Sequence, residues 1–241
     1  MISRNLETPV RTYQHPDAQS RVDLIGTVHY AEPDYYRQIQ DIIDEHTTSG
    51  AVTHCELVSA VSQADFDAAP RRVRRSLHYL TSLEIGIDAL AKKAGLVSQQ
   101  EALVLSASGG HHDTDELTLG AKLNPYALGA LVLMMKAGNA LARIAPTEAR
   151  RQAVIDALYA GDSGSTSFLS NALNFNNMAS VLSDRNETTL AAADVHFAEH
   201  PQTDLVLPWG VEHIPGLSAG FEQRGFEQTA EYSLVAIHAQ P

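Results

Sequence analysis

The chain has 241 residues and a mass of 26.1 kDa, which suits one sizeable α/β domain and is short for two. Its net charge of −12 argues against a nucleic-acid partner, because a phosphate backbone is bound by basic surfaces. The single cysteine excludes an internal disulfide, so the composition is consistent with a reducing compartment.

The sequence also lacks the usual signs of membrane targeting. Residues 1–7 do not contain the apolar core of a signal peptide. The most apolar stretch, residues 126–144, is interrupted by Lys136, Asn139 and Arg143, and it falls short of the roughly 18–20 apolar residues of a membrane-spanning helix. We therefore expect a cytoplasmic protein without a membrane partner, and its oligomeric state is left open.

The first predicted unit is a strand, a helix and a second strand. Residues 22–25 form an apolar run that ends at Gly26. Residues 34–49 carry apolar side chains at helical spacing, and Gly50 is a natural stop for that helix. Residues 51–57 form the next strand. Such a unit predicts a right-handed crossover between two parallel strands.

The middle of the chain is predicted to be helical. Two helix-like stretches lie within residues 64–95, one spans 126–143, one spans 146–159, and two more lie within 166–200. The basic run at 71–75 is interpreted as a solvated helix face. Strands return at residues 204–207 and 232–237.

We therefore predict a single α/β domain over residues 1–241. Its central sheet is mixed, largely parallel, and formed by the N- and C-terminal parts of the chain. A helical insertion occupies the middle, roughly residues 64–200.

Two short segments near opposite ends of the chain are alike. Each is an apolar run followed by Gly-x-x-His, which ends at His29 in the first segment and at His213 in the second. Glycine lets a strand turn sharply, and ligands bind beyond the carboxyl ends of strands in open α/β sheets. Either histidine alone fits a turn residue that caps a carbonyl group. The matching pair favours a shared functional site.

Glu56 is a third candidate, because it ends the predicted strand 51–57. A lone buried carboxylate is costly, so Glu56 is either paired with an arginine or part of a ligand site. Two imidazoles and one carboxylate suit a divalent transition metal with an open position for water. We predict His29, Glu56 and His213 as ligands of manganese, cobalt or zinc.

Arg185 opens a predicted helix of mixed polarity. Its guanidinium can clamp Glu56 bidentately or stabilise the oxyanion of a tetrahedral intermediate, and an exposed helix arginine is the plainer alternative. Residues 109–116 are rich in ligand-type side chains, so His112 and Asp113 are additional candidates for a metal or substrate role. The alternative for this segment is a solvated loop with an aspartate that caps the next helix.

These motifs resemble the TraB/PrgY/GumN group, which includes the Tiki metalloproteases and lies near the erythromycin-esterase-like and ChaN-like proteins. The resemblance covers most of the chain. Residues 24–29 are similar to the first Gly-x-x-His of that group, residues 54–57 to its strand-end glutamate, and residues 182–186 to its arginine motif. Residues 210–217 are similar to its second Gly-x-x-His with the trailing Pro-Gly. Asp184 stands where the group usually has glutamate.

The resemblance implies an α/β fold and a site built from both histidines, the glutamate and the arginine. For the Tiki branch it also implies manganese- or cobalt-dependent cleavage of peptides. Carried over to this sequence, it places His29, Glu56 and His213 at the metal, with Arg185 in support.

The leading hypothesis is a metal-dependent hydrolase that acts on a peptide or amide bond. Glu56 would be a metal ligand or the general base on a bound water, and Arg185 would stabilise the developing oxyanion. One alternative is a non-catalytic protein that binds or sequesters a peptide or small ligand in the same cleft. Another is an esterase-like enzyme that acts on a small molecule such as a lactone.

Overall fold

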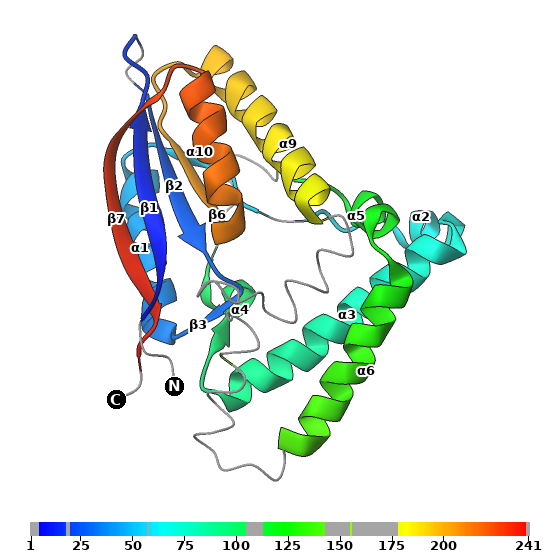
Figure 1. Cartoon of the computed structure of the whole chain (residues 1–241). Helices are drawn as coiled ribbons and strands as arrows, with labels where there is room; N and C mark the ends of the chain where they lie inside the picture. The colour runs from blue at the N-terminus through cyan, green and yellow to red at the C-terminus, as the bar shows by residue number, and fades with distance from the viewer. Residues whose placement is uncertain are drawn as a thin grey trace. The chain divides into compact units, whose positions relative to one another are not determined.

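A computed structural model of the chain describes residues 5–17, 20–56, 58–104, 113–142, 155 and 178–239. The chain divides into two compact units. The first comprises Met1–Ile2, Ser59–Leu96 and Asp115–Val181, and the second comprises Ser3–Val58, Val97–Thr114 and Leu182–Pro241. Figure 1 shows the elements of both units, and each unit is described by itself below.

The second unit contains the sheet and the helices that cover it. Its strands are β1 (Leu6–Gln14), β2 (Arg21–Thr27), β3 (Tyr30–Ala31), β4 (Val52–Thr53), β5 (Val97–Ser98), β6 (Leu205–Gly210) and β7 (Glu227–Ile237). Its helices are α1 (Pro33–Thr48), α4 (Gln99–Ala102), the 3₁₀ turn η1 (Val211–His213), α10 (Ile214–Gln223) and α9 (Met178–Glu199) from Leu182 onward.

The main sheet has five strands in the order β4-β6-β2-β1-β7. β6 lies between β4 and β2 and is parallel to both, whereas β1 is antiparallel to β2 and to β7. The sheet is mixed and is formed by the N- and C-terminal parts of the chain, so the predicted fold class is confirmed. The predicted unit of strand 22–25, helix 34–49 and strand 51–57 corresponds to β2, α1 and β4, with β6 between the two parallel strands.

β1 was not among the predicted strands, and its burial explains why. Only Thr8, Val10 and Tyr13 of its nine residues are buried, so it lacks an apolar run. β2 and β6 are almost wholly buried and read clearly as strands from the sequence. β7, which pairs with β1 along most of its length, begins at Glu227, before the predicted strand 232–237.

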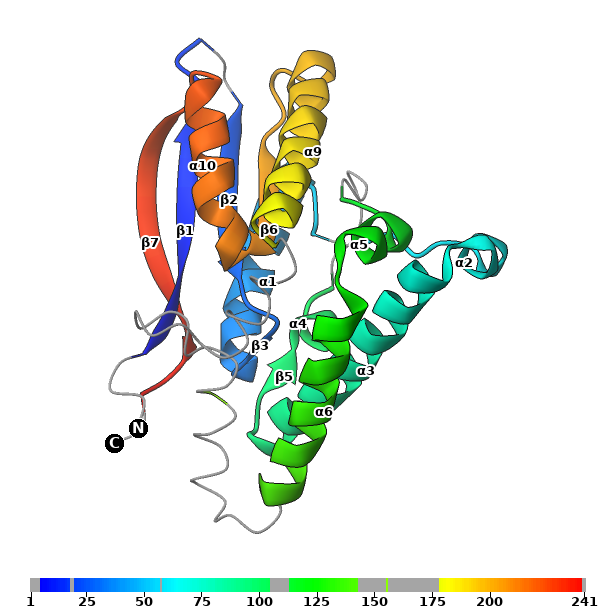
Figure 2. The same cartoon turned by 45° about the vertical axis from the view of Figure 1, so that its right-hand side comes forward.

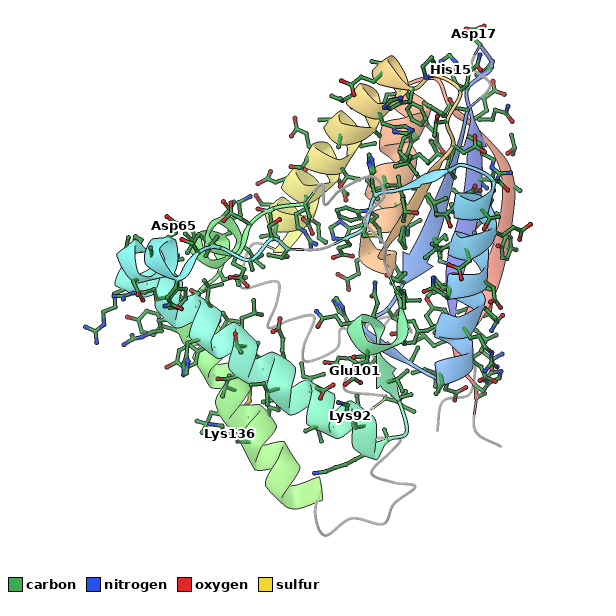
Figure 3. The ribbon with its side chains drawn as sticks, turned by 180° about the vertical axis from the view of Figure 1, so that it is seen from behind. His15, Asp17, Asp65, Lys92, Glu101 and Lys136 are labelled. Atoms are coloured by element: carbon green, nitrogen blue, oxygen red, sulfur yellow. The ribbon has the colours of Figure 1, made fainter. Side chains whose placement is uncertain are left out.

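Helices cover both faces of this sheet. α1 lies on one face, and α10 and the later part of α9 lie on the other (Figures 1 and 2). Figure 3, drawn from behind, shows α1 in front of the strands. The core between the sheet and the pair α9 and α10 is formed by large apolar side chains: Tyr13, Val22, Leu24, Leu190, Leu205, Leu207, Trp209, Ile214, Leu217, Phe221 and Phe226.

α1 also fixes the end of β2. The Tyr35 hydroxyl donates a hydrogen bond to the carbonyl oxygen of Gly26 (2.9 Å), and the Tyr36 hydroxyl donates to that of Val28 (2.6 Å). Both tyrosines are fully buried. A buried carbonyl needs a hydrogen-bond donor, so these two contacts hold the backbone that leads to His29 in one conformation.

The first unit is helical in its described part. It contains α2 (Gln63–Ala68), α3 (Arg71–Lys93), α5 (Glu116–Lys122) and α6 (Pro125–Ala142). α3 and α6 pack against each other around Leu83, Leu123, Leu128, Leu131 and Val132. The predicted helix 146–159 and the part of 166–200 before residue 178 lie outside the described residues, apart from residue 155.

No single helix in the described ranges combines the length and the apolar character of a membrane span. Only α5 and the first part of α6, taken together across a 92° bend, reach that length and composition.

Candidate functional site

The predicted site residues follow the carboxyl ends of three adjacent strands. His29 comes after β2, Glu56 after β4, and His213 ends the short turn η1 that follows β6. Since these strands are parallel, their carboxyl ends lie at the same edge of the sheet, which is where open α/β sheets bind ligands. Asp113 and Arg185 belong to the same unit and join this cluster.

Glu56 is held by two donors, one on each carboxylate oxygen. Arg185 Nη2 donates to Oε1 at 2.7 Å, and the backbone N–H of Gly210 donates to Oε2 at 2.6 Å. Burial acts to raise the pKa of Glu56, but the charges of Arg185, His213 and His29 and the bond from Gly210 together hold it below its usual range. Glu56 is therefore a carboxylate in the neutral pH range.

Arg185 forms a buried ion pair with a second acid, Asp113. Its Nε donates to Oδ1 at 2.8 Å and its Nη2 donates to Oδ2 at 2.5 Å, while the Asp113 side chain is fully buried. The bidentate clamp that the sequence suggested for Glu56 is thus made to Asp113, and Glu56 receives one bond. One guanidinium therefore faces two carboxylates, and the cluster of these three groups has a net charge of −1.

His213 is buried and is oriented by Asn186. Its Nδ1 lies 2.6 Å from Asn186 Oδ1, and an amide oxygen only accepts, so Nδ1 carries the proton. Burial is the main cause that lowers the pKa of His213, although Glu56 opposes it. The neutral ring therefore has its lone pair on Nε2, which lies 3.6 Å from Glu56 Oε1.

Trp209 forms the wall behind His213. The two rings meet edge to face at a centroid distance of 5.1 Å, and the Arg185 guanidinium lies 5.7 Å from the indole centroid. The indole N–H donates to the carbonyl oxygen of His54 at 3.2 Å, so the ring has a fixed orientation. Trp209 is fully buried and is the single tryptophan of the chain.

His29 lies at the exposed rim of the cluster. Its carbonyl oxygen accepts a hydrogen bond from the backbone N–H of Gln99 at 2.9 Å, which fixes the backbone, while the residue as a whole is exposed. Its charge, when protonated, acts on both Glu56 and His213, so the ring is within electrostatic range of each. His29 and His213 therefore differ: one is a solvent-facing imidazole and the other is buried.

The spacing of Glu56 and His213 fits two ligands of one metal ion. Two ligands held at about 2.1 Å from a tetrahedral ion lie about 3.4 Å apart, close to the 3.6 Å between His213 Nε2 and Glu56 Oε1. An acceptor that fixes the second ring nitrogen, as Asn186 does, is typical of metal-binding histidines. Within the described ranges, however, no three His, Cys, Asp or Glu side chains are grouped so as to hold an ion.

The two additional candidate residues, His112 and Asp113, differ in outcome. The structure brings Asp113 into the cluster with Arg185, whereas His112 lies outside the described residues. Two contributors had no predicted role, namely Asn186 and Trp209. Each directly follows or precedes a motif residue in the sequence, but adjacency does not reveal that Asn186 bonds to an imidazole 27 positions away.

No protein-family profile, no curated protein and no solved structure matches this chain.

Proposed function

We propose that this protein is a metal-dependent hydrolase that acts on a peptide or amide bond. His213 and Glu56 would hold a divalent transition metal, such as manganese, cobalt or zinc, and His29 would be the third ligand from the exposed rim. The proposal extends the resemblance of the two Gly-x-x-His segments to the TraB/PrgY/GumN group. The observation that carries it is the free Nε2 of His213, which faces Glu56 Oε1 at 3.6 Å in a buried, charged cluster.

Each residue of the cluster has a role in this proposal. A bound metal would lower the pKa of a water ligand and polarise the carbonyl group of the substrate. Glu56 is ionised at neutral pH, so it would serve either as a metal ligand or as the base that accepts a proton from the attacking water. Arg185 would place its positive charge next to the developing oxyanion. Trp209 excludes water from one side of His213, which strengthens these interactions because the local dielectric is low.

Metal binding can be followed through Trp209, since this single indole contacts His213. The chain is stripped with a chelator, titrated with Co²⁺ while tryptophan fluorescence is recorded, and then assayed for bound metal. We expect quenching and one equivalent of metal in the wild type, and a loss of affinity of at least about tenfold in His213→Ala and His29→Ala. His78→Ala, at an exposed position of the other unit, is the matched control. Undiminished binding in the two site variants would reject the metal site.

A second candidate is a protein that binds a peptide or small ligand in the same cleft without catalysis. The observation that favours it is the engagement of both Glu56 oxygens, one by Arg185 and the other by the Gly210 N–H. A panel of peptides, amides and lactones, assayed with added Mn²⁺, separates the two candidates. Hydrolysis by the wild type that is lost in Glu56→Gln supports the hydrolase. If only lactones are hydrolysed, the substrates are esters and not peptides or amides. Ligand binding without turnover in the wild type supports the binding protein.

A further inference from the structure

The helical unit carries a basic pocket that the cluster around Glu56 does not involve. The pocket is lined by three arginines from the start of α3 and by two residues from the start of α6: Arg71, Arg72, Arg75, Pro125 and Tyr126. Figure 3 shows the two helices packed side by side, with Asp65 in α2 at the end where α3 begins and Lys92 near the other end of α3. All of these residues belong to one unit.

Among the residues that the structure describes, no carboxylate neutralises the charge of this pocket. The two aspartates of α2 bind polar side chains instead: Asp65 accepts a hydrogen bond from Ser62 (2.5 Å), and Asp67 accepts one from Gln63 (3.0 Å). The first turn of α3 contains no acidic residue. None of the three pocket arginines forms an ion pair with a carboxylate in the part of the chain that the structure describes.

This arrangement costs the protein some stability. Arg71 and Arg75 are one helical turn apart, and like charges at that spacing repel by a few tenths of a kcal/mol. The amino end of a helix is also positive, so the first turn of α3 favours acidic side chains and disfavours guanidinium groups. In a chain whose net charge is −12, these three arginines pair with no carboxylate among the described residues and form a local centre of positive charge. A bound anionic ligand would offset their mutual repulsion.

The pocket is held in shape by contacts between α3 and the start of α6. Ser76, next to Arg75 and fully buried, donates a hydrogen bond from Oγ to the carbonyl oxygen of Leu123 at 3.3 Å. Asn124 Oδ1 accepts from the backbone N–H of Tyr126 at 3.0 Å, which caps α6. The backbones that carry the arginines and Tyr126 are therefore fixed relative to each other before any ligand binds.

We propose that this pocket binds a phosphate group. A guanidinium presents a planar fork of N–H donors that matches phosphate oxygens, so Arg71 and Arg75 can bind one phosphate together while Arg72 adds charge. The first N–H groups of α3 have no partner within the helix and add partial positive charge near these arginines. Tyr126, which is 79% exposed, and Pro125 form the apolar side of the pocket, against which the organic part of a phosphate ester would lie. The proposal does not depend on the function proposed for the other unit.

The test is calorimetric titration of the full chain with pyrophosphate and with phenyl phosphate, at low and at moderate salt. We expect saturable binding that weakens as salt rises. Arg71→Ala/Arg75→Ala should weaken it at least about tenfold, because two forked contacts are lost. Arg75→Lys keeps the positive charge but lacks the planar guanidinium, so its affinity should lie between that of the wild type and that of the double variant. Arg37→Ala removes an exposed arginine of the other unit and should leave binding unchanged.

Two further arms identify the source of the phosphate. Tyr126→Ala should weaken phenyl phosphate more than pyrophosphate, because only the ester touches the ring. Vesicles of phosphatidylcholine with or without phosphatidylglycerol test a lipid headgroup: co-sedimentation only with the anionic vesicles, lost in the double arginine variant, assigns the site to a membrane surface. Saturable pyrophosphate binding without co-sedimentation assigns it to a free ligand. Binding that is absent in both arms, or unchanged in Arg71→Ala/Arg75→Ala with an unchanged circular dichroism spectrum, overturns the proposal.

Discussion

Asn186 lies against Gly216 so closely that a Cβ atom at position 216 would overlap the Asn186 Nδ2. The opposite atom of the same amide, Oδ1, accepts the Nδ1–H of His213. Gly216 belongs to the Pro-Gly that follows the second Gly-x-x-His, so the glycine makes room for the side chain that orients the histidine. The requirement is steric and does not come from a left-handed backbone conformation.

Gly216→Ala should therefore act on His213 although it does not contact the ring. The new methyl group displaces Asn186, and the Nδ1 proton loses its fixed acceptor. If His213 binds metal through Nε2, we expect affinity for Co²⁺ to fall about 10- to 100-fold in Gly216→Ala and in Asn186→Ala alike. Asn186→Asp keeps an acceptor at this position and should restore most of the affinity. Equal metal affinity in all four proteins would show that Asn186 does not orient a ligand.

Removal of the Arg185 guanidinium should destabilise the fold. Arg185→Ala leaves the fully buried Asp113 and the largely buried Glu56 without a countercharge. Losing one partner of a buried ion pair costs about 3–5 kcal/mol. Arg185→Lys retains the charge, but an ammonium group lacks the planar guanidinium that bonds to Asp113 and Glu56 together. We expect the free energy of unfolding to fall by about 1–3 kcal/mol. Urea unfolding measures both.

The matched control for this comparison is Arg224→Ala. Arg224 also binds an aspartate with two nitrogens, Asp194 in α9, but this pair is exposed to solvent. Its removal should cost less than about 1 kcal/mol. A cost for Arg185→Ala that is no larger than that for Arg224→Ala would contradict the burial of the charged cluster.

Acid should destabilise the protein in two steps that the cluster explains. Burial lowers the pKa of His213 although Glu56 opposes it, so below about pH 6.5 the unfolded state takes up a proton more readily than the folded state. The pKa of Glu56 is also held below its usual range, so further stability is lost as pH falls through that lower value. Stability from both groups is fully present above about pH 6.5.

The measurement is the urea midpoint as a function of pH for the wild type, His213→Gln and Glu56→Gln. The chain has 11 histidines, so the difference between each variant and the wild type carries the information. His213→Gln should flatten the profile near pH 6, and Glu56→Gln should flatten it below about pH 4.5. Parallel profiles for all three proteins would show that neither group changes its pKa on folding.

Cys55 should be unreactive while the protein is folded. Its side chain is almost fully buried, and burial raises the pKa of its thiol to about 11, so little thiolate is present at pH 8. We expect a disulfide reagent to label Cys55 slowly at pH 8. In urea, labelling should be rapid and should release one equivalent of the reagent's thiolate. Because this is the single cysteine, the labelling rate reports opening of the region around β4. Fast stoichiometric labelling without denaturant would mean that this strand end is open.

Much of the sheet could be predicted from the sequence, because β2 and β6 contain apolar runs and are almost wholly buried. β1 could not, since its burial comes from two antiparallel partners, β2 and β7, and not from its own apolar content. α1 was predictable because Tyr36, Ile39 and Ile43 recur at helical spacing and are all buried.

The candidate site was predictable where a residue type is costly to bury. Glu56 and Arg185 are such residues, and in the structure Arg185 Nη2 lies 2.7 Å from Glu56 Oε1. The bidentate partner of Arg185 could not be deduced, because Asp113 lies in a polar segment that also reads as a solvated loop. The contrast between a buried His213 and an exposed His29 was equally hidden, because both follow the same Gly-x-x-His pattern and only the packing around each ring differs.

The central place of β6 has a consequence for how the protein forms during translation. β6 is the neighbour that both β4 and β2 share, yet residues 205–210 leave the ribosome long after those two strands. Until then β2 has β1 as a hairpin-like partner, while β4 has no neighbour in the sheet and Glu56 remains hydrated. The charged cluster therefore assembles late, because it requires β6 to insert between β4 and β2, which are synthesised earlier.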